Sequence, residues 1–508
     1  MPSPFLHDNY LTKFEKADVV IYDGQSTEKT AFSWKLTVGM PRYALIGGTR
    51  GYNQFRRVHE QIADYEYVEL DVNDSAELER ALKDTRYSGY NIAHPYKVEV
   101  IQYLDEISDD SRRAGAVDVV MRLPDGRLRG FNTEMAAFRY MVEGYVEDRK
   151  CLIFGSGGAA TASARTLKDL GASDIVIVSR DPEEAAAKLI PDPDGEKVRL
   201  GDIYKVTGYD RLHLHYDAHV VINCTPSGKS PDVEHSPLTD HRLTMRMFSG
   251  LELAVDLIYD PYRTKFLQDA RRLTGCHIKS GVEMLIFRAI ASRNIWLGKP
   301  DETDQDKRFI TPIKRRLLQE QLNVIAVGMP GSGKTTIMRR YAYELGLKFI
   351  DTDEETEKLM GEKIADVLTE PGLGEDYFKA MEHLAVKEAC KSRGAVIATG
   401  GSTALNPLNR DLLRANGIVV YVRRPLDKLD KRGRQISINK GLAEFFNARD
   451  RIYRRTADMS ILNSRIFGER RAKTGEGNTY NYELKGFVYY IARKIERYLN
   501  EIADNKWT

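Results

Sequence analysis

Residues 328–336, with the sequence GMPGSGKTT, have the types and spacing of a loop that binds phosphate groups. Two glycines separated by four residues are followed directly by a lysine and a threonine, after the apolar run NVIAV and before a stretch of helical character. In such a loop the backbone N–H groups surround the β-phosphate, the lysine reaches the β- and γ-phosphate oxygens, and the threonine hydroxyl binds Mg²⁺. We therefore predict a site for ATP and Mg²⁺, with Thr335 as the metal ligand. Its residues are Gly328, Gly331, Ser332, Gly333, Lys334, Thr335 and Thr336.

A second glycine-rich turn, GSGGAA at residues 155–160, follows the apolar run CLIF and precedes a stretch rich in Ala and Leu. Strand, glycine turn and helix in this order are typical of a dinucleotide site, because the turn lets the backbone approach a pyrophosphate at the helix N-terminus. We predict that this turn binds NAD or NADP. The residues that would contact the cofactor are Gly155, Gly157, Gly158 and Ala159.

The end of the next apolar run, DIVIVSRD, should lie beside the adenosine ribose of that dinucleotide. Arg180 could stack on the adenine or contact a 2′-phosphate, whereas Asp181 could accept a hydrogen bond from a 2′-hydroxyl. Glu183 and Glu184 follow closely and add negative charge, which disfavours a phosphate. The sequence therefore leaves the choice between NADP and NAD open.

The elements that must position these two loops are short apolar runs that alternate with amphipathic stretches from residue 42 onward. Runs such as DIVIVS, HVVINCT, NVIAVG and GIVVYV are typical of buried parallel strands, and their alternation with helices predicts α/β domains. A chain of 508 residues is too long for one compact core. We therefore predict several α/β domains.

Composition and charge exclude several classes of function. Lys and Arg total 76 and Asp and Glu total 74, so the chain shows no charge excess that would favour nucleic acid or a membrane surface. The four cysteines are scattered without CxxC spacing, which argues against a disulfide framework or a zinc site. No signal peptide and no apolar run of spanning length are visible, so we expect a cytoplasmic protein. Its oligomeric state stays open.

Five segments of the first half of the chain occur in a characteristic order. They are GYNIAHPYK (89–97), GFNTE (130–134), INCTPSG (222–228), DLIYDPYRT (256–264) and GVEMLIFRA (281–289). Together with the first glycine turn they resemble the shikimate dehydrogenase family over about residues 42–298. The resemblance implies hydride transfer between a nicotinamide and a ring carbonyl or alcohol, with proton transfer at the oxygen.

The resemblance also implies roles for particular residues. Lys97 corresponds to the catalytic lysine, and Glu134 replaces the aspartate that is paired with it in the family. Asn91 and Tyr259 are retained as substrate contacts. A lysine near the reacting oxygen can move the proton there, and a neighbouring carboxylate can orient that lysine.

Several pocket positions differ from the family pattern. The Ser-x-Ser segment that binds the substrate carboxylate falls on residues 53–55, which are Asn-Gln-Phe, and the motif's threonine is Ala93. Asp118 stands where an asparagine is expected, and Arg288 replaces a glutamine that hydrogen-bonds the ring. We include Asp118 and Arg288 among the expected substrate contacts, and the differences leave the ring substrate open.

The second half contains another ordered set of segments after the phosphate loop. They are FIDTDEE (349–355), GEDYFKAME (374–382), ATGGS (398–402) and NARDRIYRRTAD (447–458). Together they resemble shikimate kinase over about residues 321–505. By that resemblance Asp353 would orient or deprotonate the accepting hydroxyl, and Arg449 would bind the substrate carboxylate. Gly400 and Gly401 would direct backbone N–H groups to the substrate.

Two further arginines of the second half take roles from the same resemblance. Arg432 corresponds to an adenine-side arginine, and Arg434 corresponds to a lid arginine that neutralises charge on the transferring phosphoryl group. The family's Phe-Arg pair is Phe378-Lys379 here, so Lys379 would be a point charge at the carboxylate site. Ser402 ends the glycine triplet of the family, and Arg451 replaces its proline.

These patterns predict the following organisation. Residues 1–41 form an N-terminal extension without assigned function. Residues 42–147, completed by a helix near 281–297, form a shikimate-dehydrogenase-like α/β substrate domain, and residues 148–280 form a Rossmann NAD(P) domain. A polar segment at 298–320 is a linker. Residues 321–505 form a P-loop α/β kinase domain of the nucleoside-monophosphate-kinase-like type.

The leading functional hypothesis is a bifunctional enzyme that reduces 3-dehydroshikimate to shikimate and then phosphorylates shikimate with ATP. An alternative is a paralogue that performs the same two reactions on a related cyclic polyhydroxy carboxylate, such as a quinate-like or amino-shikimate-like ring. A third hypothesis is a regulatory protein that keeps both folds without turnover. Lys97, Lys334, Thr335 and Asp353 argue against the third, because a sensor has little need of them.

Overall fold

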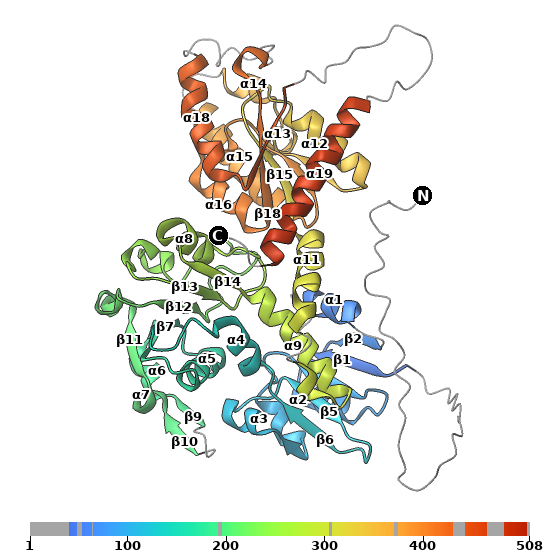
Figure 1. Cartoon of the computed structure of the whole chain (residues 1–508), viewed down its shortest axis with the longest axis vertical. Coiled ribbons are helices and arrows are strands. Elements are labelled where there is room, and N and C mark those ends of the chain that lie inside the picture. Colours follow the sequence, from blue (N-terminus) through green and yellow to red (C-terminus); the bar gives the residue numbers. More distant parts are fainter. Residues whose placement is uncertain are drawn as a thin grey trace.

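The computed structural model describes residues 40–47, 53–62, 65–191, 196–303, 307–369, 374–429, 442–464 and 482–504. Nearly all of the N-terminal extension, together with Arg432 and Arg434, lies outside these ranges. Three main β-sheets are present in the described residues. Residues 40–303, here called the N-terminal part, contain two of them, and residues 323–504, the C-terminal part, contain the third (Figure 1).

The first sheet has six strands in the order β2-β1-β3-β5-β6-β4 and is mixed. Strands β1, β2 and β3 are parallel to each other, whereas β5 runs antiparallel to both β3 and β6. The strands are β1 (Arg42–Ile46), β2 (Glu66–Leu70), β3 (Gly89–Ile92), β4 (Glu106–Ile107), β5 (Val119–Arg122) and β6 (Leu128–Phe131). The helices of this region are α1 (Asn53–Ile62), α2 (Ser75–Lys83), α3 (Asp109–Ala114) and α4 (Glu134–Val142).

The second sheet has six parallel strands in the order β11-β8-β7-β12-β13-β14. They are β7 (Lys150–Phe154), β8 (Asp174–Ser179), β11 (Lys205–Gly208), β12 (Val220–Asn223), β13 (Leu253–Asp256) and β14 (His277–Ser280). The helices are α5 (Gly158–Asp169), α6 (Pro182–Ala187), α7 (Leu200–Ile203) and α8 (Lys265–Thr274), and β9 (Leu189–Pro191) pairs with β10 (Lys197–Arg199) separately. Strands β12 and β13 are buried along their whole length, which explains their continuous apolar sequence.

The third sheet has five parallel strands in the order β16-β17-β15-β18-β19. They are β15 (Asn323–Val327), β16 (Phe349–Asp351), β17 (Val396–Ala398), β18 (Gly417–Arg423) and β19 (Met459–Leu462). The helices are α12 (Lys334–Leu345), α13 (Thr352–Met360), α14 (Ile364–Val367), α15 (Gly374–Cys390), α16 (Pro407–Ala415), α18 (Leu442–Thr456) and α19 (Tyr482–Ala503). These three sheets confirm the predicted α/β fold class.

Several short 3₁₀ helices complete the described elements. They are η2 (Glu99–Tyr103), η3 (Tyr209–His215), η4 (Thr239–His241), η5 (Met245–Met247), η6 (Pro300–Glu302), η7 (Lys307–Phe309), η8 (Thr403–Leu405) and η9 (Leu426–Lys428). No helix in the described ranges combines the length and the apolar character needed to cross a membrane.

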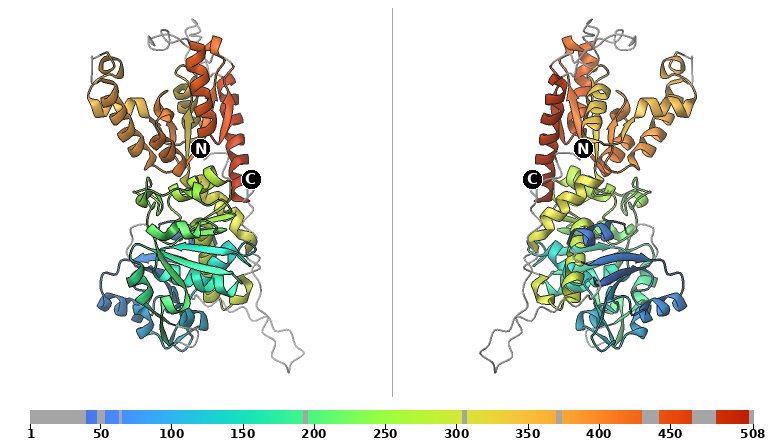
Figure 2. Two further views of the ribbon diagram at one scale, coloured as in Figure 1. Left: turned by 90° about the vertical axis from the view of Figure 1, so that its left-hand side faces the viewer. Right: turned by 90° about the vertical axis from the view of Figure 1, so that its right-hand side faces the viewer.

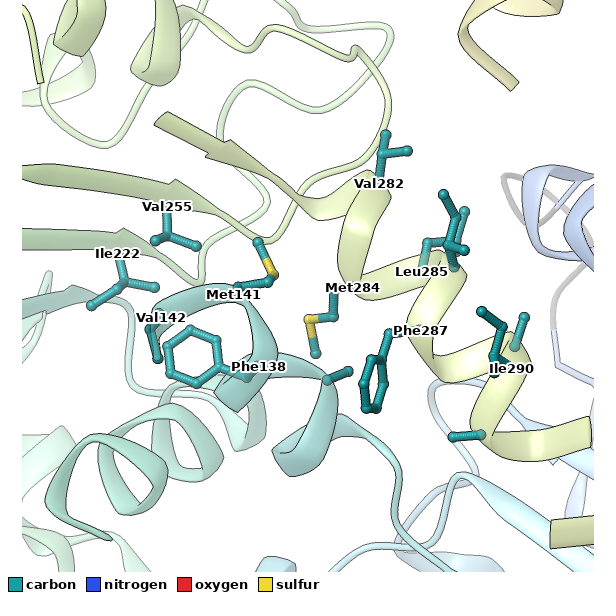
Figure 3. Close-up of a cluster of buried hydrophobic side chains, with 14 of the residues drawn as sticks. Phe138, Met141, Val142, Ile222, Val255, Val282, Met284, Leu285, Phe287 and Ile290 are labelled. Carbon is teal, nitrogen blue, oxygen red and sulfur yellow. The ribbon is translucent and has the colours of Figure 1, made fainter. Parts of the chain in front are cut away.

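Helix α9 (Gly281–Trp296) joins the two sheets of the N-terminal part. It is buried on nearly every side, which explains why its sequence is apolar all round. Figure 3 shows Met284 of this helix beside Phe138 and Met141 of α4, with Ile222 and Val255 of the second sheet nearby. This packing fixes the position of the first sheet relative to the second.

The segment predicted as a linker contains helix α11 (Ile310–Gln321), which contributes to two separate cores. Ile310, Ile313 and Leu317 pack in the core that includes α4 and α9. Leu318, one residue later, packs with Leu322 in the core of the third sheet. Figures 1 and 2 show this helix at the junction of the two parts, near the end of α19.

Candidate active sites

The N-terminal part brings Lys97 and Glu134 together. Lys97 lies in the turn after β3 and Glu134 is the first residue of α4, and the distance from Lys97 Nζ to Glu134 Oε1 is 2.5 Å. Burial alone would raise the Glu134 pKa, but the positive charges of Lys97 and Arg288 lower it to about 2. The carboxylate is therefore ionised at neutral pH and can orient the Lys97 side chain.

Arg288 of α9 connects this pair to Asp118. Its Nη1 lies 3.4 Å from Glu134 Oε1, and its Nε and Nη2 each lie 3.1 Å from Asp118 Oδ2. Asp118 is fully buried and also accepts hydrogen bonds from the backbone N–H and the hydroxyl of Thr133. The Arg288 guanidinium lies 5.6 Å from the Phe55 ring centre. Asp118 and Arg288, two of the positions that differ from the family pattern, are thus paired with each other.

Asn91 lies at the same end of the first sheet and is joined to Arg288 through Ser292, whose hydroxyl donates to the Arg288 carbonyl oxygen at 2.8 Å. Asn91 Oδ1 accepts from the Tyr67 hydroxyl at 2.9 Å, and its Nδ2 donates to Ser292 Oγ at 2.8 Å. The ring of His59 stacks on Tyr67 with 4.0 Å between centres, and burial lowers the His59 pKa to about 3. His59 is therefore neutral. The sequence did not single out Tyr67, Ser292 or His59, because residues so distant in the chain carry no shared motif.

Tyr259 lies on the loop between β13 and α8 and is half-buried against the core that contains α9. Both ends of this loop are tied to Asp256, whose carboxylate accepts from the Ile258 backbone N–H at 3.0 Å and from the Thr264 hydroxyl at 2.6 Å. Burial raises the Asp256 pKa to about 7, against the lowering effect of these hydrogen bonds. Asp256 thus anchors both ends of the loop at the end of the second sheet.

The first glycine turn fits a dinucleotide. Helix α5 begins at Gly158, and no side chain caps its N-terminus, so its first backbone N–H groups remain available to an anion. Gly157, Gly158 and Ala159 are exposed, and a Cβ placed on either glycine would meet nothing within 4 Å. The turn therefore leaves open space in front of the helix N-terminus, as a bound pyrophosphate requires.

Arg180 and Asp181 have different surroundings at the end of β8. Both are exposed, but the Asp181 carboxylate accepts from the Glu184 backbone N–H at 2.9 Å and so caps helix α6. Arg180 has no ion-pair partner among the residues that the structure describes. Of the two residues expected beside the ribose, Arg180 is thus the one whose charge is available to bind a cofactor.

The second glycine loop has the backbone of a phosphate-binding loop. Gly328 and Gly333 have φ angles of +148° and +90°, which residues with a Cβ adopt only under strain. Lys334 Nζ donates to the carbonyl oxygens of Gly328 and Met329 at 2.8 and 3.1 Å. The lysine thus lies across the same loop that it follows in the sequence. Other loop residues named from the sequence, Gly331, Ser332 and Thr336, lie in the same segment and its helix.

Thr335 lies beside an acidic residue that can share a cation with it. Its hydroxyl donates to Asp351 Oδ2 at 2.9 Å, and Asp351 Oδ1 accepts from the Asp353 backbone N–H at 3.0 Å. Hydroxyl and carboxylate oxygens are the ligands that Mg²⁺ prefers. The residues present therefore fit a magnesium ion, with Asp351 as an additional candidate at the end of β16.

Asp353 lies against the glycine pair that follows β17. A Cβ on Gly400 would lie 2.4 Å from Asp353 Oδ1, so only glycine allows this approach. Burial raises the Asp353 pKa to about 6; Lys334 opposes this effect, while Asp351 and Glu382 add to it. A carboxylate of this pKa is a stronger base than an ordinary aspartate and is still ionised at neutral pH.

Arg449 and Tyr453 of α18 reach the same glycine pair. Arg449 Nη1 lies 3.2 Å and the Tyr453 hydroxyl 2.5 Å from the Gly401 carbonyl oxygen. The Gly400 backbone N–H donates to Thr352 Oγ1 at 3.1 Å, so it is engaged within the protein and does not face open space. Of this pair, the Gly401 carbonyl is the group that the arginine contacts.

Glu382 of α15 is a buried acid that sequence reasoning did not assign. Its Oε1 accepts from Ser402 Oγ at 2.8 Å and Thr403 Oγ1 at 2.9 Å, and burial raises its pKa. It thereby fixes the segment after the glycine pair, and Ser402 is the residue that ends the family's glycine triplet. The hydroxyl residues at positions 402 and 403 are the sequence signal for this contact.

The motif predicts Lys379 at the substrate carboxylate, but the structure does not place Lys379 beside Asp353, Gly401 and Arg449. Its side chain is exposed and pairs with Glu375 at 3.0 Å and Asp376 at 3.7 Å on its own helix. Residues three and four apart on a helix share one face, so these acids hold the lysine at the surface. Among the described residues, Arg449 is the cation at the glycine pair.

Two protein families match this chain, one in each of its two parts. A family model described as shikimate dehydrogenase substrate binding domain matches residues 52–120, and one described as shikimate kinase matches residues 330–466. A shikimate dehydrogenase (NADP(+)) of Caldicellulosiruptor bescii is 31% identical over 275 residues, which cover 51% of this chain and 89% of the relative. The corresponding enzyme of Methanothermobacter thermautotrophicus is 34% identical over 219 residues, or 42% of this chain and 74% of the relative.

A solved structure covers the same region. The crystal structure of a chorismate mutase/shikimate 5-dehydrogenase fusion protein from Clostridium acetobutylicum has 30% sequence identity and a TM-score of 0.46, and covers 54% of this chain and 98% of that chain. The dehydrogenase match lies in the N-terminal part and the kinase match in the C-terminal part, as the ordered motifs predicted. The chain therefore belongs to the shikimate dehydrogenase family and continues into a shikimate kinase domain, so that it is a bifunctional enzyme of the shikimate pathway.

Proposed function

We propose that the N-terminal part reduces 3-dehydroshikimate to shikimate with NADPH, and that the C-terminal part phosphorylates shikimate with ATP. The observation that carries this proposal is one proton-transfer group in each part. Lys97 is held by Glu134 at 2.5 Å in the first, and Asp353, with a pKa of about 6, lies near Lys334 of the phosphate loop in the second. Lys97 can donate a proton to a carbonyl oxygen, and Asp353 can accept one from a hydroxyl group.

We propose the following division into domains. The first sheet with helix α9 forms the substrate-binding domain, residues 42–147 and 281–297, and the second sheet forms the NADP-binding domain, residues 148–280. The third sheet and its helices form the kinase domain, residues 321–505. The three separate sheets support these bounds.

In the dehydrogenase reaction the Lys97 ammonium donates a proton to the carbonyl oxygen of the substrate. Bound NADPH supplies the hydride that the carbonyl carbon receives, so the two transfers together yield the alcohol. Glu134 holds Lys97 in position and stays ionised because Lys97 and Arg288 lower its pKa. Asn91, Tyr259, Asp118 and Arg288 contact the ring substrate.

Arg180 supports NADPH over NADH as the reductant. Its exposed guanidinium has no ion-pair partner in the described residues, whereas the Asp181 carboxylate caps its own helix. A guanidinium can bind the 2′-phosphate that distinguishes NADPH. The relatives named shikimate dehydrogenase (NADP(+)) point the same way.

Replacing Arg180 by glutamine should raise the KM for NADPH roughly ten- to hundredfold, because a hydrogen-bonded charge pair with the phosphate is lost. The KM for NADH should stay unchanged. Steady-state rates with each cofactor at saturating ring substrate measure both constants. Arg199→Gln, an exposed arginine of the same domain, is the control. Equal changes for both cofactors would show that Arg180 does not contact the 2′-phosphate.

In the kinase reaction Asp353 accepts the proton of the attacking hydroxyl, which then bonds to the γ-phosphorus as the bond to the β-phosphate oxygen breaks. Lys334 neutralises charge on the β- and γ-phosphate oxygens, and Thr335 with Asp351 would hold Mg²⁺. Arg449, rather than Lys379, binds the substrate carboxylate beside Gly400 and Gly401. For Arg432 and Arg434, which lie outside the described residues, the proposed roles at adenine and the phosphoryl group are retained.

The raised pKa of Asp353 gives the kinase an expected pH dependence. The base is ionised above its pKa, so kcat/KM for shikimate should fall about tenfold per pH unit below about pH 6 and be level above it. Initial rates at saturating ATP and Mg²⁺ across this range give the profile. A profile that stays level down to about pH 5 would show that the base does not have a raised pKa in the complex with ATP and Mg²⁺.

Two assays on the purified full chain test the proposed function. NADPH oxidation is followed by absorbance with 3-dehydroshikimate, and ADP release is followed with ATP, Mg²⁺ and shikimate. We expect turnover in both. Absence of either at millimolar substrate would reject that half of the proposal, and a panel of quinate-like and amino-shikimate-like rings would then identify a related substrate.

A further inference from the structure

We propose that the kinase domain positions Tyr259 in the dehydrogenase site, and that Arg393, Asn416 and Asp458 are the residues through which it does so. The inference rests on the proposed role of Tyr259 as a substrate contact. It adds that the loop carrying this tyrosine, residues 257–264, is held by the other domain as well as by its own.

The loop is fixed at both ends by the N-terminal part. Asp256 bonds Ile258 and Thr264, as described above, and Asn223 donates to both oxygens of the Asp256 carboxylate at 3.2 Å. Gly281 at the start of α9 also packs directly on the loop, because a Cβ there would lie 2.3 Å from the Leu257 carbonyl oxygen. The middle of the loop, residues 260–263, receives two backbone bonds from the N-terminal part, because the Ser230 N–H and Gln268 Nε2 each donate at 3.0 Å to the carbonyl oxygens of Asp260 and Arg263. Its further contacts come from the kinase domain.

Arg263 is the most deeply buried link between this loop and the kinase domain. Its Nη1 lies 2.8 Å from Asp458 Oδ1, its Nη2 donates to the Gly417 carbonyl oxygen, and only 6% and 8% of the two charged side chains are exposed. Asp458 also accepts from the Val419 backbone N–H and the Tyr498 hydroxyl, both at 2.7 Å. A buried pair with these additional bonds fixes its partners in one geometry, because neither charge can be left unpaired without a large penalty.

Asp260 and Tyr262 flank this link and are bonded to the same domain. Asp260 Oδ1 accepts from Arg393 Nη2 at 2.8 Å and from Asn416 Nδ2 at 3.1 Å. The Tyr262 backbone N–H donates to Asn416 Oδ1 at 2.9 Å. Tyr259 precedes Asp260 directly, so its backbone lies between the Asp256 network and the contacts made by the kinase domain.

A second loop of the N-terminal part is held by the same domain. Val233 packs on the core around β15 and β17, and Glu234 Oε2 lies 2.5 Å from Lys387 Nζ on α15. The two loops are also joined, since the Ser230 backbone N–H donates to the Asp260 carbonyl oxygen at 3.0 Å. Figures 1 and 2 show the kinase domain resting on this side of the N-terminal part, next to α8.

These contacts have a consequence for substrate binding. A loop that is already ordered before substrate arrives does not have to lose conformational freedom on binding, so the affinity for the ring substrate is higher. The cofactor loop on β7 and α5 has no part in these contacts. Loosening the middle of the Tyr259 loop should therefore raise the KM for the ring substrate and leave the KM for NADPH unchanged.

Arg393→Gln is the variant that tests this inference, because Arg393 belongs to the kinase domain and its side chain is 31% exposed, so the fold should tolerate the change. We expect the KM for 3-dehydroshikimate to rise about three- to tenfold, less than for loss of a charged hydrogen bond to the substrate itself, because Arg393 acts only through the loop. The KM for NADPH and both kinase constants should be unchanged. Arg393→Lys, which keeps the charge, should restore part of the effect.

Arg339→Gln is the matched control. It removes a similar arginine–carboxylate pair, Arg339 with Glu354 at 2.7 Å, from an exposed surface of the kinase domain, and it should leave all dehydrogenase constants unchanged. An unaltered KM in Arg393→Gln would overturn the inference. So would equal changes in all constants of both reactions, because they would indicate general destabilisation.

Tyr259→Phe separates failure of the inference from failure of the proposed site. If this variant leaves the KM for the ring substrate unchanged, Tyr259 is not a substrate contact and both statements are wrong. If it raises that KM while Arg393→Gln does not, Tyr259 keeps its role and only positioning by the kinase domain is rejected.

Discussion

Replacing Lys334 by alanine should lower kcat for phosphoryl transfer about 10³-fold and leave the dehydrogenase rate unchanged. The ammonium follows the phosphate loop directly and is buried against it, with hydrogen bonds to Gly328 and Met329. With ATP bound it would face the β- and γ-phosphate oxygens, where negative charge shifts during transfer. Removing it leaves that charge without its nearest cation. Coupled ADP release at saturating ATP and shikimate measures the loss.

Lys348→Ala is the control for this change, since Lys348 is an exposed lysine on the same domain. It should behave as the parent protein in both assays. NADPH oxidation by Lys334→Ala reports whether the variant is folded. A phosphoryl-transfer rate within about twofold of the parent would be incompatible with a phosphate site at this loop.

Replacing Lys97 by methionine should reduce kcat for the dehydrogenase by roughly 10²- to 10⁴-fold, which is the usual contribution of a positioned acid or base. Methionine keeps the length of the side chain but cannot donate a proton to the substrate oxygen. Glu134 keeps its contact with Arg288, so the remaining pocket should stay in place. The change should therefore appear mainly in kcat and much less in the KM for either substrate.

Stopped-flow or steady-state NADPH oxidation measures this effect, with ADP release by the kinase domain as an internal measure of folding. Lys83→Met is the control, because Lys83 is an exposed lysine of the same region that pairs only with Glu79 in the described residues. If Lys97→Met kept full turnover, the proton would have to come from another group, and the proposed role of the Lys97–Glu134 pair would be rejected.

The sequence predicted well what depends on local spacing. The phosphate loop, the dinucleotide turn and the alternation of buried strands with helices each occupy one short segment, and the backbone there follows from glycine positions and apolar runs. Three parallel or mixed sheets in the expected order of motifs confirm the α/β class.

What the sequence did not show depends on residues far apart in the chain. Asp118 and Arg288 appeared in the sequence as two separate differences from the family pattern. Although they lie 170 positions apart, they form one ion pair, so the charge of each residue compensates for that of the other. Glu382 had no assigned role, because its partners Ser402 and Thr403 approach it only in the folded chain. Lys379 was assigned to a pocket by its motif position, while its helical neighbours hold it at the surface.

Helix α11 was also hidden by composition. The segment 298–320 is rich in charged residues, which predicts a linker, but the apolar residues of α11 have helical spacing and are buried. Lys314 within it is itself buried and pairs with Glu283 at 2.6 Å. In the sequence, Lys314 therefore indicated an exposed polar linker, whereas in the structure it forms a buried ion pair with Glu283.

This helix makes the connection between the two enzymes a shared structural element. Any cut that separates them must pass through or beside a helix whose residues 310–317 complete one core and whose residues 318–322 complete the other. A fragment that ends before residue 310 exposes apolar surface on the dehydrogenase, and one that begins after residue 322 does the same to the kinase. On heating, the two enzymes should accordingly unfold in a single transition. Expression of either enzyme alone should require that α11 is kept with it.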